Sequence, residues 1–480
     1  MLRPALLAAA LAAACPAHAD DADLAALRAE VQKMKTDYET RIQTLEARLA
    51  RAEATAAANA VQPAVPAQDA ASSAPSNPGA FNPEISLILQ GGYAHLKDLP
   101  ARRITGFLPD GTAPATSRGF SVDDSELVLS SNIDPYFRGY FNATLNDGTV
   151  GVEEAWFQTL ALGQGLTVKG GRFRSGIGYQ NEQHPHAWDF ATNNLMYEAL
   201  FGEGYGNDGL QLRWVAPTDL FTELGAEIGR GANFPGTDRN TNGIGNYALY
   251  GHVGGDVGDS HSWRGGVSYL STRADARTGK LADFAGNDVN TVFTGDSKTW
   301  LADFVWKWAP RGNSTIHNFK FAAEAFRREE SGSLDCIGTS LCGAGAYQAT
   351  QYGGYAQGVY QFMQHWRAGY RYDLLDPGSR DFGLNNAKLP NSDYKPTRHS
   401  LMVDYSPSEF SRWRLQYTKD KATEGQDENQ WYVQYIFSLG THGAHSFKGN
   451  PDESIPFIRH PRRGLAGLRP CRAQCFCLRA

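Results

Sequence analysis

The stretch NQWYVQYIFSLGTHGAHSF, residues 429–447, alternates between two kinds of side chain. One set of alternate positions is apolar or aromatic, namely Trp431, Val433, Tyr435, Phe437 and Leu439. A period of two predicts a β-strand, because successive side chains of a strand point to opposite faces. We therefore expect an amphipathic strand here, close to the end of the chain and followed by a lone aromatic residue, Phe447.

The same alternation recurs through residues 81–447. Clear cases are EISLILQGGY at 84–93, TWLADFVWKW at 299–308, WRAGYRYD at 366–373 and RWRLQYT at 412–418. In a soluble sandwich the apolar face would pack in a core, whereas in a membrane barrel it would face lipid and the polar face a water-filled lumen. Periodicity alone does not separate these two folds.

The N-terminus favours the barrel. Residues 1–19 contain Arg3, an apolar run and the triplet AHA before Asp20, which predicts a secretory signal peptide cleaved after Ala19. Lipid attachment at Cys15 is the alternative. No later stretch reaches the roughly 18 apolar residues of a membrane-spanning helix. We therefore expect an all-β protein in contact with lipid, in the outer membrane of a Gram-negative bacterium.

Composition supports a large transmembrane antiparallel β-barrel. The 480 residues include 51 Gly, 24 Phe, 21 Tyr and 10 Trp, as expected for strands with aromatic girdles. At about 23 residues per strand and connection, residues 81–447 would supply about 16 strands, and a barrel of that size leaves an aqueous channel. A net charge of −6 gives no reason to expect nucleic acid as a partner. Motifs of nucleotide-binding, hydrolase or metalloprotease sites are lacking, so no enzyme is predicted.

Three further segments flank the barrel region. Residues 20–53 carry apolar side chains at heptad-like spacing from Leu24 to Ala52, which predicts a short coiled coil and, with it, a homotrimer; a single amphipathic helix is the alternative. Residues 54–80 are rich in Ala, Pro and Ser and are predicted to be a linker. Residues 448–480 lack alternation and are predicted to be a disordered, dispensable tail, although its cysteines could instead bind a metal. Phe447 would then be the terminal aromatic that the barrel-insertion machinery reads.

Charged residues on the polar faces of the predicted strands are candidates to line the pore. Their signs are mixed, so no ion selectivity is predicted. They are Arg213, Glu223, Glu227, Arg264, Asp303, Lys307, Lys320, Glu324, Arg367, Arg371, Asp373, Arg412 and Arg414.

The segment NEQHPHAWDF, residues 181–190, is the tightest group of potential metal ligands. Glu182, His184, His186 and Asp189 offer the nitrogen and oxygen donors that Zn²⁺ accepts. The alternative is a polar loop that folds into the channel or over its mouth, since Pro185 disfavours a central strand. No other cofactor is predicted.

Two cysteines, Cys336 and Cys342, bracket a short Gly/Ser loop. In an oxidising compartment this spacing favours a local disulfide.

Residues 152–183 resemble the phosphate-selective O/P-type porins. The resemblance is carried by Glu153, Glu154, Gly165, Leu166, Thr167, Gly171, Arg172 and Phe173. It implies a trimeric, 16-stranded outer-membrane porin and, for type members, an anion-selective pore. The family usually has a basic residue and then proline after the GRF triplet, whereas here the sequence is Arg174-Ser175-Gly176-Ile177-Gly178. The charges on the polar faces are also mixed, so anion selectivity is not carried over.

The NEQHPHAWDF segment also resembles outer-membrane proteins described as zinc-regulated and TonB-dependent-receptor-like. A receptor of that kind has a plug domain of roughly 150 residues, which residues 20–80 cannot supply. The expected function is passive diffusion of small hydrophilic solutes or ions. The alternative is a receptor-like barrel for metal (zinc) uptake or binding, without a TonB-type plug.

Overall fold

The computed structural model describes residues 83–99, 103–107, 117–146, 148–338 and 342–440. The predicted signal peptide, coiled coil, linker and tail lie outside these residues, as does Phe447.

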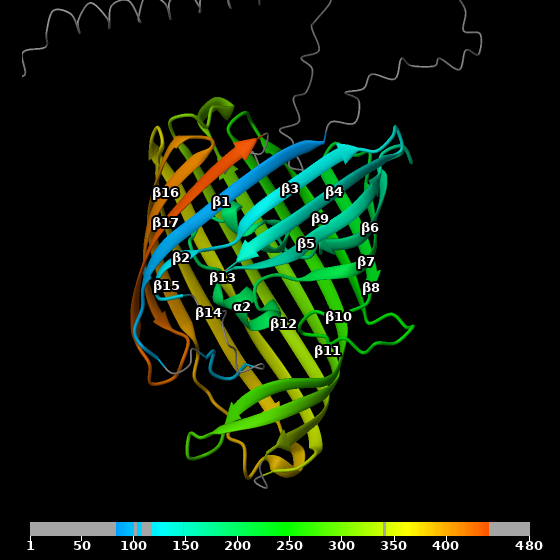
Figure 1. Ribbon diagram of the computed structural model, residues 1–480, viewed down its shortest axis with the longest axis vertical. Coiled ribbons are helices and arrows are strands. Elements are labelled where there is room, and N and C mark those ends of the chain that lie inside the picture. Colours follow the sequence, from blue (N-terminus) through cyan, green and yellow to red (C-terminus); the bar gives the residue numbers. More distant parts are fainter. Residues whose placement is uncertain (1–82, 100–102, 108–116, 147, 339–341, 441–480) are drawn as a thin grey trace, which may run out of the picture. The chain divides into compact units, whose positions relative to one another are not determined.

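The described residues form one antiparallel sheet that closes on itself (Figure 1). Strand β1 pairs with β17 from Ser86–Gly440 to His95–Trp431, and β9 pairs with β10. The short β2 pairs with the second half of β1 and β3 with its first half, so β2 and β3 share one position in the ring. The result is a closed barrel of 16 strands, which confirms the predicted fold. The strands are β1 Glu84–His95, β2 Gly119–Val122, β3 Ser125–Asn132, β4 Phe137–Asn146, β5 Thr149–Thr159, β6 Leu166–Arg174, β7 Gly206–Val215, β8 Phe221–Gly229, β9 Asn246–Val257, β10 His261–Ala282, β11 Asp288–Trp308, β12 Asn318–Ile337, β13 Gly345–Met363, β14 Trp366–Asp381, β15 Thr397–Ser408, β16 Ser411–Lys421 and β17 Glu428–Gly440.

Side chains alternate across the barrel wall with apolar groups outside and polar groups inside. In β15, Leu401 is 54% exposed and Val403 41%, whereas Asp404 between Val403 and Tyr405 is 1% exposed. Strand β17 shows the same alternation: Trp431 and Val433 are exposed, whereas Gln430 and Gln434 are buried. A soluble sandwich would have the opposite arrangement, with the charges outside.

Five neighbouring strands, β10 to β14, are much longer than the rest, with 16 to 22 residues each. They continue past the level at which the other strands end (Figure 1). An apolar cluster that includes Phe293, Leu334, Tyr347 and Phe382 packs in this extension. The disulfide Cys336–Cys342 belongs to the same cluster and joins the end of β12 to the connection before β13.

Residues 175–205, between β6 and β7, fold inside the barrel and are called the insert from here on (Figure 1). The insert contains two single-turn 3₁₀ helices, η1 Gln180–Glu182 and η2 Pro185–Ala187, and the helix α2 Leu195–Phe201. Its apolar side chains pack with inward-facing residues of the wall in one buried cluster, for example Leu200 with Leu301 and Phe326. The described helices also include η3 Pro310–Gly312 and η4 Gly383–Asn385; none in the described residues is long and apolar enough to cross a membrane.

Candidate functional site

Arginines of the barrel wall bind backbone carbonyl groups of the insert. Arg371 of β14 donates to the carbonyl oxygens of Thr192 at 2.8 Å and Asn193 at 2.7 Å. Arg412 and Arg414 of β16 both donate to the Trp188 carbonyl, at 3.1 and 2.7 Å. Carbonyl groups in an irregular segment have no ladder partners, and a buried carbonyl needs a donor. The arginines therefore hold residues 188–193 against one side of the wall.

Carboxylates of the wall also bind the insert, by accepting hydrogen bonds from its backbone N–H groups. Glu324 of β12 accepts from the N–H groups of Tyr179 at 3.0 Å and Gln180 at 2.8 Å. The hydroxyls of Tyr197 and Tyr355 donate to the same carboxylate. The chain reaches Glu324 this closely because residue 178 is glycine: its φ is +69°, and a Cβ there would lie 2.5 Å from Glu324 Oε2.

Two more acidic residues hold the start of the insert and the start of α2. Glu227 of β8 accepts from the Ser175 hydroxyl at 2.6 Å and the Gly176 N–H at 2.9 Å. Asp373 of β14 accepts from the Leu195 N–H at 3.1 Å, at the first residue of α2. Hydrogen bonds to charged groups are stronger than neutral ones, so these contacts fix the insert in the lumen.

The residues predicted to line the pore all lie on the interior face of the wall, and most of them serve the insert or each other. Lys320 and Arg367 reach Asp189 at 2.6 and 3.3 Å. Arg264 pairs with Glu182 at 2.8 Å and lies 3.6 Å from Asp303. Arg213 lies 3.6 Å from Glu223, and Lys307 is buried.

The predicted metal-binding group does not assemble. Glu182 turns to Arg264 and Asp189 to Lys320 and Arg367, so two of the four ligands are engaged by cations elsewhere. The reason is that the insert turns at η1 and η2, which sends neighbouring side chains to different parts of the wall. Only the rings of His184 and His186 stay together, stacked 5.8 Å apart.

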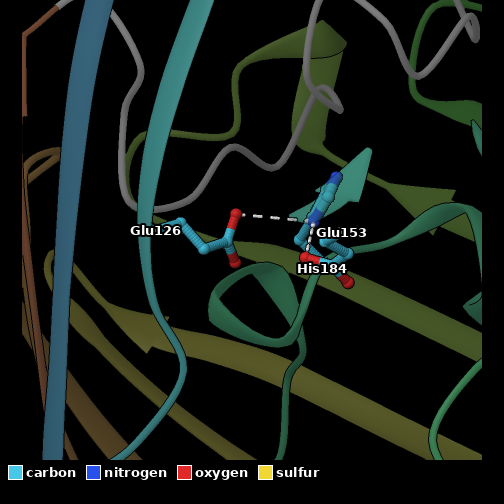
Figure 2. A group of neighbouring side chains, drawn as sticks. All are labelled: Glu126, Glu153 and His184. Atoms are coloured by element: carbon cyan, nitrogen blue, oxygen red, sulfur yellow. Dashed lines mark ion pairs between the residues drawn. The ribbon is translucent and has the colours of Figure 1, made fainter. Parts of the chain in front are cut away.

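His184 instead lies among three carboxylates of the wall. Its Nδ1 is 3.4 Å from Glu126 of β3 and 3.3 Å from Glu153 of β5, and its Nε2 is 3.5 Å from Glu154. Figure 2 shows the carboxylates of Glu126 and Glu153 turned toward the ring. We call these four residues the histidine cluster. His186 also reaches Glu126, at 2.8 Å.

A β-bulge explains why two adjacent glutamates reach one ring. Glu154 pairs with Asn142 of β4 and Val152 with Ala143, which leaves Glu153 as an extra residue in β5. Adjacent residues of a regular strand point to opposite faces, but a bulge re-aims a side chain. The bulge therefore brings Glu153 to the same side as Glu154, where Arg174 pairs with it.

The electrostatics of the histidine cluster favour an imidazolium ion. Burial alone lowers the pKa of His184, but Glu126 and Glu153 raise it, and the net result is a pKa well above the usual value. The pKa of Asp189 is shifted in the opposite direction. Burial raises it, but the positive charges of Lys320 and Arg367 lower it by more, so the net pKa is below the usual value. Both residues of the insert are thus held in their charged forms by the wall.

The described side chains include two groups with ligand atoms close enough for one metal ion. Glu126, Glu153 and His184 form one, and Glu182, Glu223 and His252 form the other, each within 4.8 Å. In the first, a metal would have to displace the His184 proton. In the second, Glu182 already pairs with Arg264, and Arg213 lies beside Glu223.

A cavity of about 210 Å³ lies between the insert and the wall. The insert contributes residues from Pro185 to Glu203, and the wall contributes β1 from Gln90 to Ala94 and β17 from Glu428 to Gln434. The connection around β2 lines it as well, through Ser121 to Asp124. It is an interior space beside the insert that reaches both the middle of β1 and the loop that follows β1.

Three residues that join the insert to the wall were not predicted as site residues: Glu126 and Arg398 of the wall, and Glu198 of the insert itself. Arg398 donates to both oxygens of Glu198, at 2.7 and 3.1 Å, and contacts Asp420 at 2.7 Å. One signal was present: residues 175–205 interrupt the strand alternation with the apolar run LMYEALF, which has no place in a surface loop.

One relative shows the family of this chain. An uncharacterized protein of Aquifex aeolicus is 30% identical over 406 residues, which cover 78% of this chain and 81% of that protein. No family model matches the sequence, so membership of the phosphate-selective O/P group is not confirmed.

Similar solved structures are outer-membrane proteins. A loop-deletion mutant of OmpT from Vibrio cholerae is 13% identical, with a TM-score of 0.48, over 75% of this chain and 99% of that one. An anion-selective porin of Comamonas acidovorans is 10% identical over 75% and 99%, with a TM-score of 0.45. The channel DcaP of Acinetobacter baumannii is 13% identical over 75% and 97%, also with 0.45.

Proposed function

The chain belongs to the same family as the uncharacterized Aquifex aeolicus protein, and we propose that it is an outer-membrane porin through which small hydrophilic solutes and ions diffuse. The observation that carries the proposal is the inverted polarity of the barrel, with apolar side chains outside and charged ones inside. An outward apolar surface suits lipid, and a charged interior suits water and solutes.

The insert makes the proposed channel a narrow one. A 16-stranded barrel without contents would leave a wide aqueous lumen. Here wall residues on β8, β12, β14 and β16 anchor the insert through hydrogen bonds. Solutes would pass beside the insert, so the channel would admit only small molecules.

Liposome swelling tests the proposal. Purified protein reconstituted into liposomes should admit small sugars and exclude oligosaccharides, with rates that fall steeply as solute size rises. Protein that migrates in its folded, heat-modifiable form but admits none of these solutes would contradict a diffusion channel.

Assembly remains part of the proposal. We expect a homotrimer in the outer membrane, inserted by machinery that reads Phe447. Crosslinking of membranes before and after deletion of residues 20–53 would test the role of the predicted coiled coil. Trimers should weaken without it, and monomers in both cases would contradict this assembly.

A metal-binding receptor is the second candidate, favoured by the ligand atoms of Glu126, Glu153 and His184. One imidazole nitrogen and two carboxylates form a donor set that Zn²⁺ accepts. Zinc titration of the folded protein should then show binding that His184→Gln abolishes. Absence of binding, or binding unchanged by that substitution, would remove this candidate.

A further inference from the structure

We propose that the cavity beside the insert is a vestibule for small cations and makes the channel cation-preferring, an inference that rests on the proposed porin function. The observations that carry it are the charge of the lining and an unpartnered buried acceptor within it.

The lining of the cavity is predominantly acidic. It includes the carboxylates of Asp123, Asp124, Glu198, Glu203, Asp420 and Glu428. The basic side chains among the described residues of the lining are those of Arg103 and Arg398. The acidic side chains come from four places in the chain, namely the β2–β3 connection, the insert, β16 and β17, so the fold gathers them around one space.

The two arginines do not neutralise this lining. Arg398 is shared between Glu198 and Asp420, so one positive charge serves two carboxylates. Arg103 pairs with Asp288, which is not part of the lining. Among the described residues that line the cavity, acidic side chains therefore outnumber basic ones.

Three carboxylates of the lining, those of Asp123, Asp124 and Glu203, form no ion pair among the described residues, although the charge of Arg174 acts on Glu203. Asp123 accepts a hydrogen bond from the Ser121 hydroxyl at 2.7 Å, and Asp124 accepts one from the Asn146 amide. Glu203 follows α2 in the insert and is exposed. Neutral donors leave the charge of an ionised carboxylate uncompensated, while burial raises the pKa of all three groups, that of Asp124 to about 7.

Gln90 of β1 adds an independent sign of a ligand. It is only 6% exposed and lines the cavity, yet its side-chain oxygen has no hydrogen-bond partner among the described residues. A buried amide oxygen without a donor is costly, and a cation that enters the cavity would satisfy it. Acidic walls of low dielectric also concentrate cations by focusing the field.

The test is the reversal potential of reconstituted channels across a KCl gradient in planar bilayers. The unmodified protein should favour K⁺ over Cl⁻. The variant Asp123→Asn/Asp124→Asn/Glu203→Gln should reduce that permeability ratio by about twofold or more, since it removes three acidic side chains that attract cations to the cavity. A matched control, Asp219→Asn/Asp259→Asn/Glu409→Gln, removes exposed carboxylates of three turns outside the cavity and should leave the ratio unchanged.

Two results would overturn the inference while leaving the porin function intact: conductance without K⁺ preference, or a preference that the cavity variant does not change. Absence of any conductance would instead overturn the porin function and the vestibule together. If the triple variant does not fold, Glu203→Gln alone serves. The Glu203 carboxylate has no hydrogen bond among the described residues, and its loss should still lower the ratio.

Discussion

Arg371 donates a hydrogen bond of 2.7 Å to the carbonyl oxygen of Asn193, across 178 positions of the sequence. Arg371 is 1% exposed and also contacts Asp373 at 3.1 Å. A side chain expected to face open solvent is therefore a fixed link between the wall and the insert. Arg412, Arg414 and Glu324 were likewise expected to line an open pore and instead bind the insert. Substituting them should therefore loosen the insert.

Replacing Arg371 should loosen the insert. Arg371→Ala removes the arginine donor to the Thr192 carbonyl, one of two arginine donors to the Asn193 carbonyl, and the ionic partner of Asp373. Breaking a buried charged pair costs about 3–5 kcal/mol. We expect the temperature of conversion from the folded to the unfolded gel form to fall, and channel currents to become noisier. The control is Arg172→Ala, which removes a half-exposed pair with Asp208 and should cost about 0–1 kcal/mol. Equal effects of the two variants would contradict the anchoring role.

Glu324→Gln tests the carboxylate side of the anchoring. One carboxylate oxygen accepts from Tyr179 and Tyr197 and the other from Gln180 and Tyr355. The amide keeps one acceptor oxygen but replaces the other with an NH₂ group, so one of these two pairs of donors loses its acceptor. Limited proteolysis should then cleave within residues 175–205 while the barrel stays intact. A cleavage rate equal to that of the unmodified protein would show that Glu324 does not hold the insert.

The histidine cluster predicts a pH dependence. Because the pKa of His184 is raised in the folded protein, its contribution to stability is fully present below the usual histidine pKa of about 6.5 and is lost as pH rises through the higher folded value. The unfolding temperature should therefore fall on the alkaline side. In His184→Gln this particular fall should be absent, and an identical pH profile for the two proteins would contradict the assignment.

The disulfide should stabilise only the extension of the long strands in which it lies. Cys336 and Cys342 are six positions apart, so the bond closes a small loop in the extension of β12 and β13. Cys336→Ser/Cys342→Ser should speed proteolysis near residue 340 and leave conductance unchanged. Loss of the channel in this variant would mean that the extension supports the barrel itself.

Truncation after Phe447 tests the predicted tail, which lies outside the described residues. We expect membrane insertion to be unchanged or improved, because the alternation ends with β17 at Gly440 and Phe447 is the last aromatic before the change of composition. A truncated chain that fails to insert while the full chain succeeds would contradict the role of Phe447.

The barrel was predictable because its signal is local. Alternation along residues 84–93 and 429–440 marks β1 and β17, and their pairing follows from the closure of the sheet. The interior placement of Arg367, Arg371 and Asp373 follows from the same period of two. These inferences need only the order of residues within one strand.

The site was less predictable because it depends on long-range contacts and on one irregularity. No local pattern shows that Arg371 meets Asn193 or that Glu126 meets His184. The bulge at Glu153 breaks the period of two and moves a side chain to the other face. Grouping Glu182, His184, His186 and Asp189 by sequence proximity failed because the turns of the insert separate them.

Single-channel conductance in planar bilayers tests the central claim most directly, that a water-filled path runs through the barrel and is narrowed by the insert. The unmodified protein should give small, uniform steps. A variant in which a short Gly/Ser linker replaces residues 177–204 should give steps several times larger. Absence of steps from correctly folded protein, or equal steps from the two proteins, would contradict the account.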